Sequence, residues 1–246
     1  MNPWNRPEAV VETQTRAVDQ GLRSFMLKVY NYMTSGVLLT AVVAYFAGTS
    51  PAFQQMLMSV GPDGAAHASP LFWLLLAAPV IMGFFVLPRI TSMSEQGAKT
   101  TFWAYAFVMG LMLWSIFAVY TQASIFRVLL ITAGTFGLMS IYGYSSKRDL
   151  TSLGSFAAVG VLAIFFTSLA NVFLFHSAGL DLALSYLGVA VALGLAAYHT
   201  QQTKNIYYQV GRSGAIGHAA IIAALNLYFA FIYLFINLLR IMGDRR

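Results

Sequence analysis

The chain has 246 residues, of which 59% are hydrophobic and only 9% are charged, and its mean hydropathy is +0.70. Soluble domains carry about 25% charged residues, so this composition excludes a sizeable soluble domain and predicts a polytopic membrane protein. The net charge of +6 comes from basic residues scattered in ones and twos, a pattern that does not favour a nucleic-acid partner. The lack of cysteine excludes disulfides, a thiol nucleophile and a cysteine-ligated metal.

Residues 1–24 are polar, and we expect them to form a cytoplasmic tail in which Glu12 to Arg23 can make a short surface helix. Residues 25–246 are expected to form one transmembrane domain. Its apolar runs are each long enough to cross a hydrocarbon core of about 30 Å as a helix. The predicted fold class is therefore all-α, a bundle of seven transmembrane helices. The seven segments cover about residues 26–48, 71–88, 101–121, 125–144, 155–177, 181–200 and 218–241.

The distribution of lysine and arginine predicts the orientation of the bundle. Ten of these residues lie in the tail and in the loops that seven crossings place on the same side, so we expect a cytoplasmic amino terminus. Seven crossings leave Arg240, Arg245 and Arg246 on the other side, against the rule. We expect the last helix to cross rather than re-enter, because six loops agree. The longest outer loop, 49–70, is expected to be a plain surface loop rather than a binding loop.

Ionisable residues inside a membrane are the usual candidates for function, because they are costly to hold there. All eight acidic residues lie in tails, loops or helix ends, so no carboxylate is placed in mid-membrane to bind a hard cation or to carry a proton. The histidine spacing fits no metal site, and no serine has an evident base. We therefore expect no metal, no cofactor and no enzymatic activity.

One histidine and two asparagines lie inside or beside apolar segments. His199 follows a small-residue face formed by Gly188, Ala192 and Ala196, and it is either a neutral side chain bonded to a backbone carbonyl or a pH sensor. In the last segment, Asn226 and Asn237 are expected to hydrogen-bond neighbouring helices. The alternative is that they line a polar cavity.

The stretch Thr132–Phe156 predicts a helix, a short charged turn and a second helix. Small residues recur on its first half, at spacings that let helix backbones approach closely. The sequence from Ile131 to Phe156, ITAGTFGLMSIYGYSSKRDLTSLGSF, resembles the signature of the Bax inhibitor-1 family in its bacterial YccA-like branch. The residues of the signature turn are Gly143, Tyr144, Lys147, Arg148 and Asp149. Further resemblance follows in family order at residues 27–41, 116–125, 167–174, 194–204 and 224–243.

The resemblance implies seven helices with the last one central, in a protein of the bacterial inner membrane. It also implies two activities known among relatives. One is restraint of an FtsH-type membrane protease, which makes this chain a non-enzymatic modulator or interaction partner of a membrane complex. The alternative is a pH-sensitive ion leak. An intramembrane hydrolase is a third possibility, which lacks a nucleophile with a base.

The chain departs from the family at the site to which the calcium leak of relatives is attributed. The family carries a pair of aspartates on its last two helices, and here the matching positions are His199 and Ala230. Replacing both carboxylates removes an anionic site for calcium. Arg89 lies near a position where the family has a basic residue. The candidate pH-sensing or pore residues are therefore His199, Asn226, Ala230 and Arg89.

Overall fold

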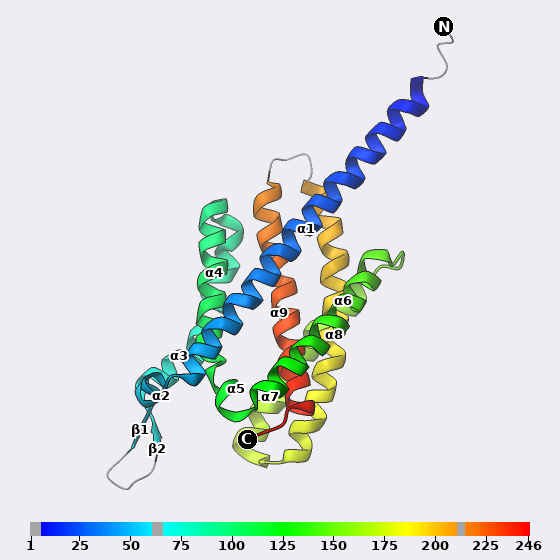
Figure 1. Cartoon of the computed structure of the whole chain (residues 1–246). Coiled ribbons are helices and arrows are strands. Elements are labelled where there is room, and N and C mark those ends of the chain that lie inside the picture. Colours follow the sequence, from blue (N-terminus) through cyan, green and yellow to red (C-terminus); the bar gives the residue numbers. More distant parts are fainter. Residues whose placement is uncertain (1–5, 61–65, 211–214) are drawn as a thin grey trace.

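The computed structural model describes residues 6–60, 66–210 and 215–246, and these residues are almost entirely helical (Figure 1). Within them, seven helical stretches are long and apolar enough to cross a membrane, which confirms the predicted fold class. Each predicted segment lies on one of these stretches. The stretches are Gln20–Thr49, Pro70–Ser92, Glu95–Val119, Gln122–Ser145, Thr151–Phe175, Ala178–Val210 and Ile216–Met242.

Several of these stretches join two or three helical elements. The α-helices are α1 (Arg6–Thr49), α2 (Pro51–Leu57), α3 (Pro70–Ile81), α4 (Glu95–Met112), α5 (Trp114–Val119), α6 (Gln122–Ser145), α7 (Thr151–Ala170), α8 (Ala178–Val210) and α9 (Ile216–Met242). A π-turn, η2 (Met82–Val86), and a 3₁₀ turn, η3 (Leu87–Ser92), continue α3, and a second π-turn, η4 (Asn171–Phe175), continues α7. Pro79 inside α3 and Pro88 in η3 each lack a backbone donor, which accounts for the irregular end of this span.

Five helices of the described chain begin after a serine or threonine whose side chain accepts a backbone N–H of the first turn. The capping residues are Ser50 for α2, Ser69 for α3, Ser94 for α4, Thr121 for α6 and Ser177 for α8. Each such cap contributes about 0.5–2 kcal/mol of helix stability. The caps therefore set where the helices begin at the ends of the apolar runs.

Helix α1 continues without a break across the predicted boundary between tail and bundle. It has 44 residues, or about 66 Å at 1.5 Å per residue, roughly twice what a span requires. The C-terminal part of α8 packs on it at Gly21 and Phe25, where the ring of Tyr207 lies. Residues 6–19 extend beyond this contact and past the neighbouring ends of α8 and α9 (Figure 1). We call residues 6–19 the N-terminal arm.

The connection between the first and second spans contains a small β-hairpin. Strand β1 (Met58–Val60) pairs antiparallel with β2 (Ala66–Ala68), with Met58 opposite Ala68. Ser69 donates from its hydroxyl to the carbonyl of Met56 at 2.8 Å and so closes the base of the hairpin. Part of this predicted loop, residues 61–65, lies outside the described residues.

The last helix, α9, is central, as the family resemblance implies. In its most apolar stretch 67% of the residues are buried, against 39% or less in each of the other spans of the described chain. Helices α1, α4, α6 and α8 all pack on it (Figure 1). Tyr228 of α9 is fully buried and its hydroxyl lies 2.8 Å from that of Thr40 in α1. Thr40 in turn donates to the carbonyl of Ala106 in α4 at 2.8 Å, so one polar chain joins three helices.

Helix α9 runs along the bundle as a single unbroken element that is long and apolar enough to cross a membrane. The residues after it pair with the connection between α5 and α6. Thr121 donates its backbone N–H to the carbonyl of Asp244 at 3.0 Å, and Arg246 donates to that of Val119 at 2.9 Å. The carboxyl end therefore lies at the end of the bundle opposite the N-terminal arm (Figure 1).

Candidate functional site

The turn between α6 and α7 is held by two side chains of α8. Gln201 accepts the backbone N–H of Leu150 at 2.9 Å and donates to the carbonyl of Arg148 at 2.7 Å. Its side chain is buried, so these bonds are shielded from water. One turn further along α8, Lys204 donates to the carbonyl of Tyr144 at 3.0 Å and places its ammonium 5.5 Å from the centre of that ring. The signature turn is thus bound to α8.

Gly143 allows this arrangement, because it lies where α6 and α8 cross. A β-carbon at this position would overlap the backbone of Ala197. The same principle acts on α7, where a β-carbon on Gly154 would strike the ring of Tyr198. Small residues let membrane helices approach closely enough for extensive van der Waals contact. The spacing of small residues in the sequence predicted that this helix crosses another one closely, and the structure shows that α6 crosses α8.

The charged residues of the signature turn face outward. Lys147 and Arg148 are exposed, as is Asp149. The Asp149 carboxylate caps the start of α7, accepting the hydroxyl of Thr151 at 2.6 Å and its backbone N–H at 2.9 Å. These two donors, the hydroxyl first, lower the pKa of Asp149 from its ordinary value.

His199 and Ala230 lie in the two helices that make the largest contact of the bundle, α8 and α9. His199 is half-buried, and its Nδ1 lies 3.4 Å from Oε1 of Gln202, one turn along the same helix. The expected bond to a backbone carbonyl is therefore replaced by a weak contact with an amide. Ala230 is buried at 1% exposure among apolar neighbours of α9.

The two asparagines of α9 differ from the expectation. Asn237 donates to the carbonyl of Tyr233 in its own helix at 2.8 Å, so the predicted bond to another helix is wrong for this residue. Its amide instead packs on Gly188 of α8, where a β-carbon would overlap it. Asn226 is half-buried and makes no hydrogen bond with another described residue. Neither asparagine joins two helices by a hydrogen bond within the described chain.

Arg89 is exposed at the end of the second span and donates to the carbonyl of Phe85 in the preceding turn. The neighbouring Ile90 is buried, and its carbonyl lies 2.7 Å from Nε2 of His218 at the start of α9. His218 therefore ties the second span to the central helix.

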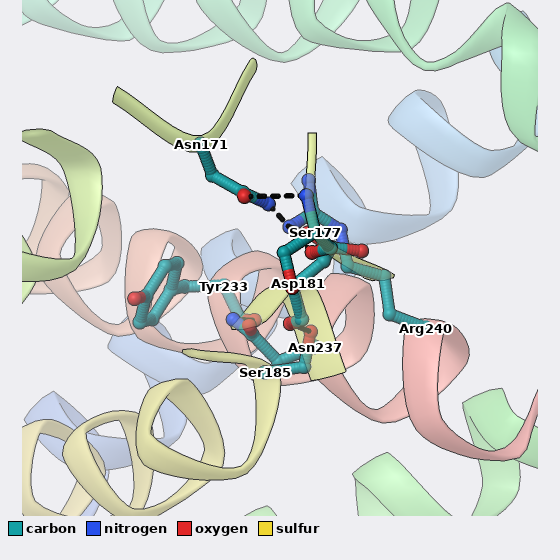
Figure 2. Close-up of polar contacts among 7 residues, drawn as sticks. All are labelled: Asn171, Ser177, Asp181, Ser185, Tyr233, Asn237 and Arg240. Carbon is teal, nitrogen blue, oxygen red and sulfur yellow. Dashed lines mark hydrogen bonds and ion pairs between the residues drawn. The ribbon is translucent and has the colours of Figure 1, made fainter. Parts of the chain in front are cut away.

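The opposite end of the bundle holds a polar cluster that the sequence did not indicate (Figure 2). Asn171 accepts the backbone N–H of Ser177 at 2.9 Å and donates to its carbonyl at 3.0 Å, which closes the turn into α8. His176 in this turn has a left-handed φ of 50°. Beside it, Asp181 of α8 and Arg240 of α9 form an ion pair at 3.5 Å. One signal in the sequence could have pointed to this ion pair. Asp181 and Arg240 carry opposite charges, and seven crossings place them at the same end of the bundle.

A second ion pair at this end joins Arg127 of α6 to Asp244 at 3.5 Å. Arg240, which lies against the charge rule, and Arg127 are thus each paired with a nearby carboxylate. Among the residues that the structure describes, no three histidine or acidic side chains gather where they could hold a metal ion. The interior between α8 and α9 is packed with small and apolar side chains instead.

Comparisons with known proteins agree with the fold. The family model described as "Inhibitor of apoptosis-promoting Bax1" matches residues 22–246. The inner membrane protein YbhL of Escherichia coli K12 is 38% identical over 249 residues, which cover 100% of both chains. An uncharacterised protein of Rickettsia prowazekii is 37% identical over 95% of each chain, and one of Caulobacter vibrioides is 35% identical over 100% of each. The chain therefore belongs to the Bax inhibitor-1 family.

Proposed function

We propose that the protein is a non-enzymatic modulator of another integral-membrane complex in the bacterial inner membrane, an FtsH-type protease being the first candidate. The membrane assignment follows from the seven spans, and the relative YbhL is named as an inner membrane protein. Because fold alone does not determine function, the proposal rests on features of this chain. The one that carries it is the N-terminal arm.

The N-terminal arm is a helix that extends past the bundle. Residues 6–19 add about 20 Å of helix beyond the level at which Tyr207 packs on α1. Because the arm is continuous with the first span, a partner bound to it would be held at a defined distance and direction from the bundle (Figure 1). The arm also carries both charge signs in Glu8, Glu12, Arg16 and Asp19. Mixed charge suits recognition of a protein surface.

The orientation of the bundle in the membrane is part of the same proposal. Nine lysines and arginines of the described chain lie at the end of the bundle that carries the arm. Four lie at the other end, of which Arg127 and Arg240 are in ion pairs. An excess of lysine and arginine favours the cytoplasmic side. The proposal therefore assigns the arm and the signature turn to the cytoplasm.

An ion leak is the second candidate, and His199 favours it. This residue lies within a membrane span with only a 3.4 Å contact to Gln202, and an ionisable side chain in a span is a candidate gate. With Ala230 in place of a second ionisable group, the site offers no carboxylate for calcium. Vesicles containing the protein would be assayed for potassium, anion and calcium flux between about pH 6 and 8. Equal flux in wild type and in His199→Ala would show that His199 is not a gate.

Co-purification tests the first proposal. The full chain and a variant lacking residues 2–19 would be expressed at native level and extracted in mild detergent. We expect an FtsH-type protease to co-purify with the full chain and to be lost from the truncated variant, because the arm supplies the docking surface. A truncated variant that still crosses the membrane and retains the protease would show that the arm is not the contact. Recovery of the full chain alone would contradict the modulator proposal itself.

A further inference from the structure

A groove of about 820 Å³ lies between α1 and α6. Its two walls are the facing sides of α1 and α6, and Phe136 and Phe231 lie at its floor, with ring centres 5.4 Å apart. Leu27, Leu38 and Leu130 line it and are more than half exposed. We call it the α1–α6 groove.

The charged side chain that lines the α1–α6 groove lies at one end of it. Arg23, from α1, and Tyr144 and Ser145, from α6, lie at the end near the N-terminal arm. Arg23 is exposed. Lys204 lies against the ring of Tyr144 and adds a second cation close to this mouth. No carboxylate is among the described residues that line the groove, so the mouth attracts an anion.

Ser140 is an independent sign of a ligand. Its side chain is buried, with 6% exposed, and its hydroxyl has no hydrogen-bond partner within the described structure. Other hydroxyls on α6 bond back to their own helix, as Thr132 does to Val128 and Ser145 does to Ile141. Ser140 instead lines the groove. A buried hydroxyl without a partner costs about 1–3 kcal/mol, which a ligand acceptor in the groove would remove.

The dimensions of the groove fit one leaflet of a bilayer. From Arg23 to Leu38 it follows α1 for about 22 Å. Half of the hydrocarbon core and one headgroup layer together measure about 20–22 Å. Ser140 lies about 7.5 Å below Ser145 along α6, where the ester carbonyls of a phospholipid follow its phosphate. The positive charge of Arg23, the length of the groove and the position of the Ser140 hydroxyl are therefore all compatible with a phospholipid.

We propose that the α1–α6 groove binds one anionic phospholipid. Its phosphate contacts Arg23, an ester carbonyl accepts the hydroxyl of Ser140, and an acyl chain lies along Gly137 toward Phe231. A second copy of this chain is the other occupant that an apolar groove could take, and the experiment below distinguishes it from a lipid. The proposal does not depend on the modulator function, since it concerns a bound lipid rather than a protein partner.

Native mass spectrometry of the full chain tests the lipid site. The protein would be released from detergent after titration with phosphatidylglycerol or with phosphatidylcholine of the same acyl chains. Gly137→Leu fills the groove without a clash, because nothing lies within 4 Å of a β-carbon at this position. Gly134→Leu is the matched control, since Gly134 is on the same helix, is equally open and does not line the groove. Arg23→Gln removes the headgroup contact, with Arg89→Gln as its control at the same end.

We expect wild type to retain one phosphatidylglycerol about tenfold more tightly than phosphatidylcholine. Gly137→Leu should reduce retention of both lipids, and Arg23→Gln should remove the preference for phosphatidylglycerol, while both controls behave as wild type. Equal retention in Gly137→Leu and Gly134→Leu would overturn the proposal. It would also be overturned if Gly137→Leu changed only the dimer content of the sample, because the groove would then be a protein interface.

Discussion

Gln201 of α8 and Leu150 of the signature turn are joined by a hydrogen bond of 2.9 Å across 51 positions of sequence. The same glutamine donates to the carbonyl of Arg148, so one buried side chain satisfies two backbone groups of the turn. This contact connects the family signature to the helix that carries His199. It makes the turn a rigid part of the bundle rather than a free loop.

Replacing Gln201 should therefore destabilise the bundle. In Gln201→Ala the N–H of Leu150 and the carbonyl of Arg148 lose their partner, and the buried N–H of Leu150, left unsatisfied, costs about 1–3 kcal/mol. We expect a clear fall in the thermal midpoint, measured by circular dichroism in detergent. Gln202→Ala is the control, because Gln202 makes only a 3.4 Å contact with His199. Equal midpoints for the two variants would show that the turn does not need Gln201.

Gly143 should tolerate no side chain. In Gly143→Ala the new methyl group meets the backbone of Ala197, so α6 and α8 must move apart. Overpacking of this kind costs about 1–3 kcal/mol. Gly137→Ala is the matched control on the same helix, and it should be neutral or slightly stabilising, because its site is open and alanine favours helix. Reversible unfolding of both variants in mixed micelles measures the difference, and a stable Gly143→Ala protein would contradict the close crossing.

The pairing of Asp181 with Arg240 should contribute little to stability. Both side chains are more than 40% exposed, at 43% and 42%, and their atoms are 3.5 Å apart. Exposed pairs contribute about 0–1 kcal/mol and are screened by salt. A double-mutant cycle of Asp181→Asn and Arg240→Gln, repeated at low and high salt, measures the coupling. A coupling well above this range, insensitive to salt, would mean that the pair is desolvated.

The cap at Asp149 predicts a dependence of stability on pH. The donors of Thr151 keep the folded pKa of this carboxyl below its ordinary value of 3.8. A carboxyl with a lowered folded pKa adds stability above its unfolded pKa and loses it as pH falls through the folded pKa. The difference in stability between wild type and Asp149→Asn should therefore be constant above about pH 5 and shrink below about pH 4. Denaturant titrations across this range provide the test, and a difference that grows in acid would have the wrong sign.

The sequence predicted all seven spans because each apolar run is long and the loops carry charge. The central position of α9 was available only through the family resemblance, since its segment is no more apolar to the eye than others. The bonds of Gln201 and the pairing of Asp181 with Arg240 could not be predicted, because their partners are 51 to 59 positions apart. Such contacts depend on how the helices pack. The continuity of α1 was hidden by the polar composition of residues 6–19, which does not itself end a helix.

The candidate site was predicted only in part. His199 and Ala230 were identified by position, and the structure puts them in the two helices with the largest mutual contact. Asn237 was expected to bond a neighbouring helix, but a carbonyl of its own helix lies closer, and Gly188 leaves room only for its flat amide. Packing of this kind depends on which faces of two helices meet, a choice that an all-apolar run does not reveal.

The central claim is that the protein restrains a membrane protease through its N-terminal arm. Its most direct test is the rate at which an FtsH-type protease degrades a membrane substrate in vesicles that also contain this protein. We expect the full chain to slow degradation in proportion to its amount, and the variant lacking residues 2–19 to leave the rate unchanged. Degradation at the same rate with and without saturating full chain would contradict the account.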